Sequence, residues 1–219
     1  MLVRLLVFGL ITLILLAIGS TLFLGPGQSL FRPSSVESLR AQRSEDGRLL
    51  GHFPYPEAKK AQLVTVAPGM KLHHDAAESY LAMQQAAAAD GVTLTLLSAF
   101  RPVEDQQQLF FSIKAQRNQT SLDRARVSAP PGFSEHSTGF AIDLGDFSQP
   151  HTNLSPSFTQ TSAFRWLKNN AARYQFTLSF PQGNPQGVNF EPWHWRYEGS
   201  VEALRLFEPA QRLRRASKT

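Results

Sequence analysis

The chain has no cysteine among its 219 residues, which excludes disulfide bonds, thiolate nucleophiles and cysteine-ligated metal sites. It also lacks internal repeats and low-complexity tracts. Its net charge is only +5, and apart from "RLRR" at 212–215 its basic residues are dispersed. A nucleic-acid-binding protein usually concentrates them, so we expect no nucleic-acid partner. The mild positive excess would suit an anionic polymer or a membrane surface.

Charged residues are also missing from positions 5–24, where an apolar run follows Arg4. As a helix it would span about 30 Å, the thickness of a bilayer core. A secretory signal has a shorter apolar region, about 7 to 15 residues, although Ala17-Ile18-Gly19 resembles a cleavage site. We expect residues 1–24 to be an uncleaved single-pass anchor in the cell membrane, with a removed signal as the alternative. Both interpretations place the rest of the chain outside the cytoplasm.

The remaining chain is long enough for one domain with a sizeable core, and we expect a monomer. Residues 25–50 are rich in Gly, Pro, Ser and Arg and are predicted to form a flexible linker. The domain is predicted to cover residues 51–210, followed by a basic tail at 211–219.

Hydrophobic periodicity predicts helices and strands in an irregular order. Asp75 and Glu78 form a predicted capping box for the first helix. A mixture without regular βαβ alternation indicates an α+β fold with a mainly antiparallel sheet flanked by helices. The predicted helices are 76–90, 103–117, 158–174 and 200–215, the last interrupted at Pro209, and the predicted strands are 92–100, 138–145, 175–181 and 193–197.

The strand "TGFAIDLG" at 138–145 carries the first candidate site residue. Alternation puts Phe140, Ile142 and Leu144 on a core face and Gly139, Ala141 and Asp143 on the other. Two minimal side chains beside Asp143 would leave space above the sheet for a ligand. His136 lies in the preceding "PPGFSEHSTG" turn region, from which it can reach the side of the strand that carries Asp143.

The segment "EPWHWRY" at 191–197 supplies the partners. Alternation places His194 and Arg196 on one strand face, and Glu191 precedes the strand behind a proline. His136, Asp143 and His194 would form a ligand set suited to catalytic Zn²⁺, with one position left open. Glu191, close but not a ligand, could transfer protons. The competing interpretation is that His194 is a buried structural histidine.

These residues resemble the M15 zinc carboxypeptidases, in particular the VanY-like D-alanyl-D-alanine carboxypeptidases. The family pattern is Ser-x-His, six residues and Asp, then Glu-x-x-His near the C-terminus. It is matched in order by Ser134, His136, Asp143, Glu191 and His194. The family's substrate-binding arginine and a glutamine five residues later correspond to Arg101 and Gln106 in "SAFRPVEDQ", where Ala99 replaces the usual glycine. The resemblance covers about residues 50–200.

The resemblance implies one Zn²⁺ per chain, with Glu191 moving the proton between water and the leaving amine. It implies that Arg101 binds the free C-terminal carboxylate, and that Gln106 and Ser134 add hydrogen bonds around the terminal residue. Without the family, Arg101 would be interpreted as part of a surface ion pair, Gln106 as an exposed helix residue and Ser134 as a turn hydroxyl.

The implied substrate is the peptidoglycan stem peptide, from which the terminal D-alanine is removed. An L,D-carboxypeptidase acting on tetrapeptide stems is the nearest alternative. A wall-binding protein without hydrolysis would be expected if Glu191 or a ligand were missing, and none is. An endopeptidase would have no use for Arg101 as a carboxylate clamp.

Overall fold

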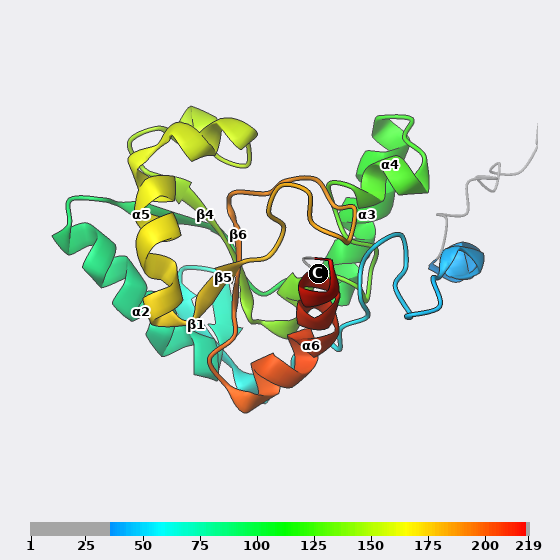
Figure 1. Cartoon of the computed structure of the whole chain (residues 1–219), viewed down its shortest axis with the longest axis horizontal. Helices are drawn as coiled ribbons and strands as arrows, with labels where there is room; N and C mark the ends of the chain where they lie inside the picture. Colours follow the sequence, from blue (N-terminus) through cyan, green and yellow to red (C-terminus); the bar gives the residue numbers. More distant parts are fainter. Residues whose placement is uncertain (1–35, 218–219) are drawn as a thin grey trace, which may run out of the picture. The chain divides into compact units, whose positions relative to one another are not determined.

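The structure is a computed structural model that describes residues 36–217 (Figure 1). The predicted membrane segment, residues 1–24, lies outside the described residues, as does the first part of the predicted linker. Within the described part, no helix is both long and apolar enough to cross a membrane.

A four-stranded antiparallel sheet in the order β3-β4-β6-β5 forms the centre of the fold. Strand β4 pairs with β3 on one side and β6 on the other, and this register sets Asp143 opposite both Ser98 and His194. A separate hairpin, which the periodicity did not predict, turns at Gly69 with a left-handed φ of 72°. The strands are β1 (Leu63–Ala67), β2 (Met70–His73), β3 (Leu94–Ser98), β4 (Ala141–Asp146), β5 (Phe176–Leu178) and β6 (His194–Tyr197).

The helices surround this sheet, which confirms the α+β class and the antiparallel pairing. Figure 1 shows α2 and α5 together on one side, α6 on another, and α3 with α4 at a distance from both. The α-helices are α2 (His74–Ala89), α3 (Val103–Gln116), α4 (Ser121–Ala125), α5 (Ser162–Asn170) and α6 (Val201–Ala216). The 3-10 helices are η1 (Val36–Gln42), η2 (Lys60–Gln62), η3 (Glu135–Thr138), η4 (Pro150–Thr152), η5 (Pro156–Gln160) and η6 (Ala171–Tyr174).

The main core confirms one predicted face of β4 and corrects the other. Phe140, Ile142 and Leu144 are fully buried, as the alternation predicts. The opposite side is not an open floor along its length, because Ala141 is equally buried. Gly139 is a left-handed residue at the end of η3, and a Cβ there would lie 2.9 Å from the backbone nitrogen of His73. That glycine is therefore required by packing and not by a ligand.

Helix boundaries differ from the prediction where tertiary contacts override local signals. The imidazole of His73 caps α2 by accepting the Asp75 backbone N–H at 3.3 Å, in place of the predicted capping box. The predicted helix 158–174 is α5 with a 3-10 helix at each end. Pro209 does not interrupt α6, because Phe207 and Ala210 on either side of it are buried and hold the helix in place.

The predicted flexible linker is wrong for residues 36–50. Leu39 and Leu49 are buried in a second apolar cluster with Phe110 and Phe111 of α3. Leu49 also forms backbone bridges to Arg43 and His52. Only four apolar side chains of this segment, Val36, Leu39, Leu49 and Leu50, pack into the cluster, so its composition is mainly polar and resembles that of a spacer. Residues 36–50 therefore belong to the folded domain, which begins no later than residue 36, the first described residue.

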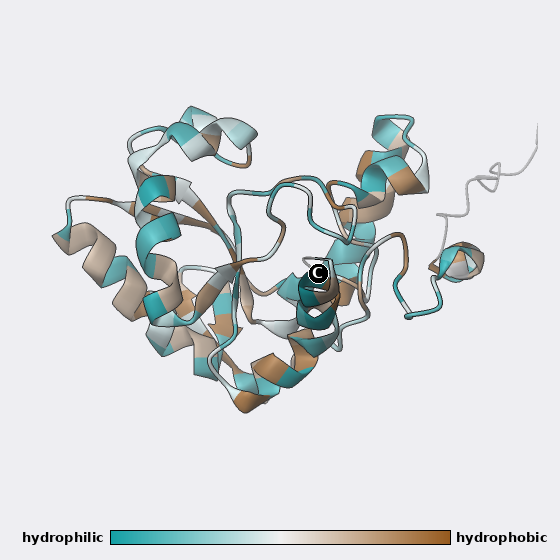
Figure 2. Cartoon of the chain, in the orientation of Figure 1, coloured by the Kyte–Doolittle hydropathy of each residue, from teal (hydrophilic) through white to brown (hydrophobic). Residues whose placement is uncertain are grey.

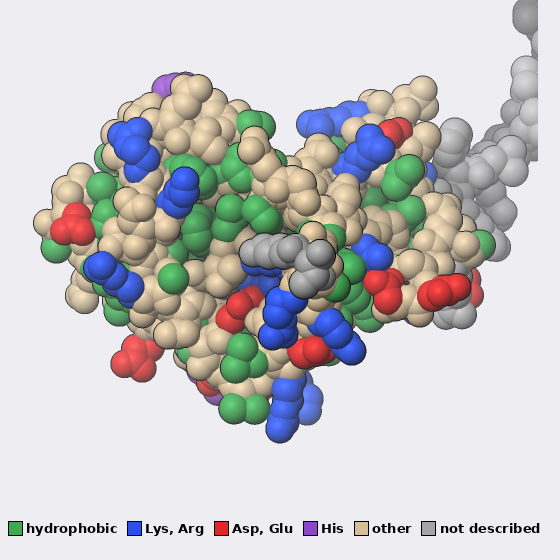
Figure 3. Space-filling view, in the orientation of Figure 1, with side chains coloured by type: hydrophobic (Ala, Val, Ile, Leu, Met, Phe, Trp, Pro, Cys, Tyr) green, Lys and Arg blue, Asp and Glu red, His purple; other side chains and the backbone are tan. Residues whose placement is uncertain are grey.

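Residues 211–216 belong to α6 and do not form a separate tail. The guanidinium of Arg214 donates to the backbone carbonyls of Leu178 and Ser179, at 3.1 and 2.7 Å, which fastens the end of α6 to β5. Figure 2 shows hydrophobic and hydrophilic residues alternating along α6, as expected for a helix with one packed side. Figure 3 shows acidic side chains among the basic ones around it.

Replacing Leu49 tests whether residues 36–50 are part of the fold. Leu49→Ala removes a fully buried side chain, and such changes cost about 2–5 kcal/mol of unfolding free energy. The expected result is a lower midpoint in chemical denaturation. Leu122→Ala is the control, because Leu122 is 49% exposed and should change stability little. Equal stability of the two variants would restore the linker interpretation.

Candidate active site

One large pocket lies beside the centre of the sheet and brings together every residue that the motifs singled out. Its volume is about 610 Å³. Leu154, Pro156 and Val127 are among the residues that line it, and Figure 3 shows a notch in the surface between the region of α5 and the region of α3 and α4. All seven predicted site residues line it, from Arg101 and Gln106 through Ser134, His136 and Asp143 to Glu191 and His194.

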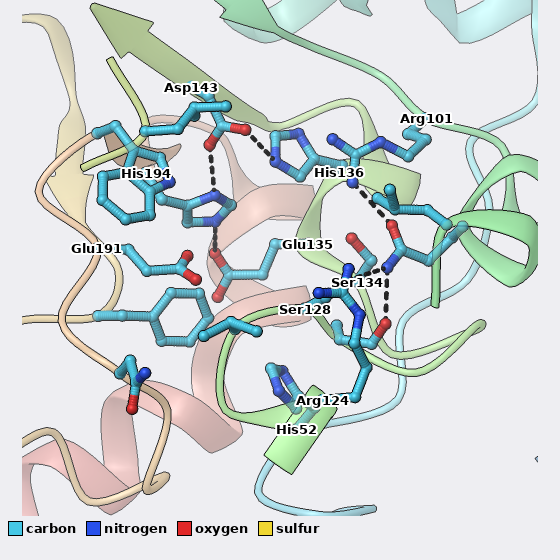
Figure 4. Close-up of a pocket in the computed structure, with 18 of the residues that line it drawn as sticks. His52, Arg101, Arg124, Ser128, Ser134, Glu135, His136, Asp143, Glu191 and His194 are labelled. Atoms are coloured by element: carbon cyan, nitrogen blue, oxygen red, sulfur yellow. Dashed lines mark hydrogen bonds and ion pairs between the residues drawn. The ribbon is translucent and has the colours of Figure 1, made fainter. Parts of the chain in front are cut away.

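The three predicted metal ligands converge at one end of this pocket (Figure 4). Nε2 of His136 lies 3.2 Å from one Asp143 oxygen, and Nδ1 of His194 lies 2.9 Å from the other. All three side chains are buried, and their ligand atoms lie within 4.8 Å of one another. His136 comes from η3, Asp143 from β4 and His194 from β6, so the β4–β6 pairing creates the cluster.

The remaining nitrogen of each histidine is held from outside the cluster. Nδ1 of His136 lies 2.8 Å from the carbonyl of Ala99, and Nε2 of His194 lies 2.9 Å from Glu135. An acceptor at these positions fixes the tautomer that leaves the other nitrogen free for a metal, as in known metal sites. Burial lowers the pKa of His136, which favours the neutral ligand form. Two histidines and one carboxylate held in this way fit a Zn²⁺ site.

Glu135 connects the cluster to a buried ion-pair network. Its carboxylate accepts hydrogen bonds from His194, from Nη1 of Arg196 at 2.8 Å and from the Ser179 hydroxyl at 2.6 Å. Arg196 is fully buried and also pairs with Glu198 at 2.6 Å. Burial opposes the charge on Glu135, but Arg196 and His194 outweigh it and hold the Glu135 pKa far below its usual range. Glu135 is therefore an anion that orients His194.

Glu191 lies beside the cluster without joining it. Its backbone N–H donates to the carbonyl of Phe180, and its own carbonyl accepts the N–H of His194, both at 3.1 Å. These bonds fix the turn before β6 and direct the carboxyl group into the pocket (Figure 4). Burial raises the pKa of Glu191 to about 8. A cation in the adjacent site would favour its ionised form. A carboxyl with this environment suits proton transfer.

Arg101 and Gln106 form a connected pair on the opposite wall. Arg101 donates from Nη1 to Oε1 of Gln106 at 2.8 Å and from Nη2 to the Ser98 hydroxyl at 2.7 Å. The Gln106 amide nitrogen donates to the carbonyl of Ala129 and the hydroxyl of Ser128, so both of its protons are used within the protein. Gln106 is thus a buried support for Arg101 and not an exposed helix residue.

Three residues of this pocket were not identified from the sequence. Glu135 gave no signal of its own, although Arg196, on the same face as His194, needed an acidic partner once buried. Arg124 on α4 is buried and lines the pocket. His52 is 3% exposed and lies 2.7 Å from the Ala125 carbonyl through Nε2.

Comparison with known proteins identifies relatives over most of the described chain. A sequence model of the family described as "VanY: D-alanyl-D-alanine carboxypeptidase" matches residues 69–200. A D-alanyl-D-alanine carboxypeptidase of Enterococcus faecalis is 28% identical over 163 residues, which cover 70% of this chain and 58% of that protein. The chain spans about half the length of the curated relatives it matches.

Solved structures of related proteins share the fold. One is VanYB in complex with D-alanine-D-alanine, 26% identical, with a TM-score of 0.58 over 76% of this chain and 93% of the other. Another is a glutamate-to-alanine mutant of the vancomycin-resistance D,D-pentapeptidase VanY in complex with Zn(II). It is 26% identical, with a TM-score of 0.55 over 71% of this chain and 89% of the other.

Substituting Glu135 tests its role as the support of His194. Glu135→Gln keeps the size of the side chain but removes the charge that His194 and Arg196 share. Loss of such a partner typically lowers metal affinity by about ten- to a hundredfold. Competition with a chromophoric chelator measures this affinity directly.

Ser179→Ala is the matched control, because it removes one neutral hydrogen bond to the same carboxylate and leaves both charges. It should lower the affinity much less. Unchanged zinc affinity in a folded Glu135→Gln protein would show that His194 is oriented by other contacts.

Proposed function

The chain belongs to the VanY family of D-alanyl-D-alanine carboxypeptidases, and we propose that it is a zinc-dependent D,D-carboxypeptidase acting on peptidoglycan stem peptides. The observation that carries the proposal is the arrangement of one pocket. The His136–Asp143–His194 cluster and Glu191 lie at one end, and Arg101 lies on the facing wall. A pocket of this kind can hold a peptide by its C-terminus with the last amide near the metal ligands.

Each residue then has a chemical task. Arg101 binds the terminal carboxylate through its guanidinium, which Gln106 and Ser98 hold in position. Ser134 lines the same pocket and offers a hydroxyl to the terminal residue. His136, Asp143 and His194 would hold one Zn²⁺, which would supply Lewis acidity at the scissile amide. Glu191 accepts the proton that water loses and delivers it to the nitrogen of the departing D-alanine.

The part of the pocket on the other side of the metal ligands from Arg101 would receive the penultimate residue of the peptide. The side chains that line this part would decide between D,D- and L,D-carboxypeptidase activity. The two activities would use the same cluster and the same carboxylate clamp. Purified enzyme incubated with pentapeptide and tetrapeptide stems, with mass spectrometry of the products, distinguishes them. We expect removal of D-alanine from the pentapeptide, abolished by a chelator. Loss of D-alanine from the tetrapeptide alone would establish the L,D activity, and binding without cleavage a wall-binding protein.

We also propose that residues 1–24 anchor the protein in the cell membrane, with the enzyme domain on the extracytoplasmic side. The charge-free run after Arg4 supports this, as does a substrate that lies outside the cytoplasm. The expected result is that the native protein stays with membranes after a carbonate wash and keeps its original N-terminus. A soluble mature chain beginning near Ser20 would favour a cleaved signal.

Two substitutions separate proton transfer from metal binding. Glu191→Gln keeps the shape of the side chain and removes no ligand, so zinc content should stay near one per chain. Its rate should fall by about 10² to 10⁴, the usual contribution of general acid–base catalysis. His194→Ala should lose zinc and activity together, because two protein ligands remain. Metal analysis and peptide hydrolysis on both proteins give the readouts, and full activity in zinc-loaded Glu191→Gln would exclude this mechanism.

A further inference from the structure

Arg124 is a buried cation without an anionic partner in the part of the chain that the structure describes. It lies on α4, is 6% exposed, and lines the active-site pocket. Its Nε is buried without a hydrogen-bond acceptor, and no described carboxylate lies within 4.0 Å of its guanidinium. Arg196, a second buried arginine, has both Glu135 and Glu198. A buried charge is unfavourable without a counter-charge, so Arg124 lacks what Arg196 has.

The surroundings of Arg124 add positive charge instead of compensating it. Arg101 and Arg117 line the same pocket, and burial followed by repulsion from these two residues lowers the pKa of Arg124. Figure 4 shows Arg124 extending from the α4 side toward the middle of the pocket, on the same side as Arg101 and Ser134 and across from Glu191. The wall that carries Arg101 and Arg124 is therefore positively charged and suited to binding an anion, and it faces the carboxylates of the pocket.

Gln106 links Arg101 to the segment that follows α4, the helix that carries Arg124. It accepts from Arg101 and donates to Ser128 and Ala129, which lie three and four residues after the end of α4 at Ala125. Arg101 and Arg124 are consequently held on one wall, although one follows β3 and the other lies on α4. Two guanidinium groups held in this way match a single carboxylate, which can accept hydrogen bonds on both of its oxygens.

We propose that Arg124 is a second carboxylate-binding residue that shares the substrate's terminal carboxylate with Arg101. This inference rests on the proposed function, since it assumes a peptide with a free C-terminus. In the free protein Arg124 stays unpaired, and the entering carboxylate provides the missing counter-charge. A peptide that continues beyond the scissile residue brings no such charge and leaves both arginines unpaired, which makes α4 a determinant of exopeptidase specificity.

The kinetic test compares free-acid and amidated substrates. Arg124→Gln should lower kcat/KM for diacetyl-L-Lys-D-Ala-D-Ala by about ten- to a hundredfold, the usual range for a lost charge-assisted contact. The C-terminal amide of the same peptide should be a poor substrate for wild type and be little changed by the substitution. Arg124→Lys should recover part of the loss. Arg126→Gln is the control, because Arg126 is exposed and does not line this pocket.

A binding measurement keeps the inference separate from the activity. Calorimetric titration of the zinc-loaded protein with D-alanine should show weaker binding in Arg124→Gln and in Arg101→Lys than in wild type, with non-additive losses in the double variant. D-alaninamide, which has no carboxylate, should bind the wild type and the variants with similar affinity. If the wild type cleaves no peptide yet binds D-alanine through Arg124, the proposed function fails and this inference stands.

Thermal unfolding of the ligand-free protein distinguishes binding from a structural role. Removing an unpaired buried charge should leave the melting temperature of Arg124→Gln unchanged or higher. The inference is overturned if that variant is less stable and loses acid and amide substrates equally. It is also overturned if the loss appears only with diaminopimelate in place of lysine, since Arg124 would then bind a side-chain carboxylate.

Discussion

The buried carboxylate of Glu135 is the interaction on which the rest of this site depends. It joins a metal ligand, His194, to a fully buried arginine, Arg196, two residues later on the same strand face. Without Glu135, Arg196 would keep only Glu198, and the imidazole of His194 would lose the acceptor that sets its tautomer. A buried pair of this kind contributes less to net stability than to fixing one arrangement of the chain, and here that arrangement is the metal site.

The pocket separates charge along its length. Carboxylates of Asp143, Glu135 and Glu191 gather around the histidines, whereas Arg101 and Arg124 lie on the other wall (Figure 4). A zwitterionic or C-terminal-acid ligand therefore meets a field that favours one orientation before any close contact forms. Two buried carboxyl groups in this one cavity have opposite pKa shifts: burial raises the pKa of Glu191, whereas Arg196 and His194 outweigh burial and lower the pKa of Glu135.

The sequence was sufficient for residues whose position follows from strand periodicity. Asp143 and His194 fall on predictable faces of β4 and β6, and their pairing brings them together once the two strands are neighbours. It was insufficient where burial depends on distant contacts. Leu39 and Leu49 occur in a polar stretch and look solvent-exposed until α3 covers them. Arg124 and Glu135 gave no local signal, because the groups that bury them come from other parts of the chain.

The strand order has a consequence for synthesis. In the sequence β5 precedes β6, yet β6 lies between β4 and β5, so the sheet is completed by inserting the later strand between two earlier ones. His194 is on that strand. A nascent chain that has not yet released β6 offers His136 and Asp143 alone, too few ligands for stable capture of a divalent ion. Completion of this ligand set therefore requires that β6 has been synthesised and has inserted between β4 and β5.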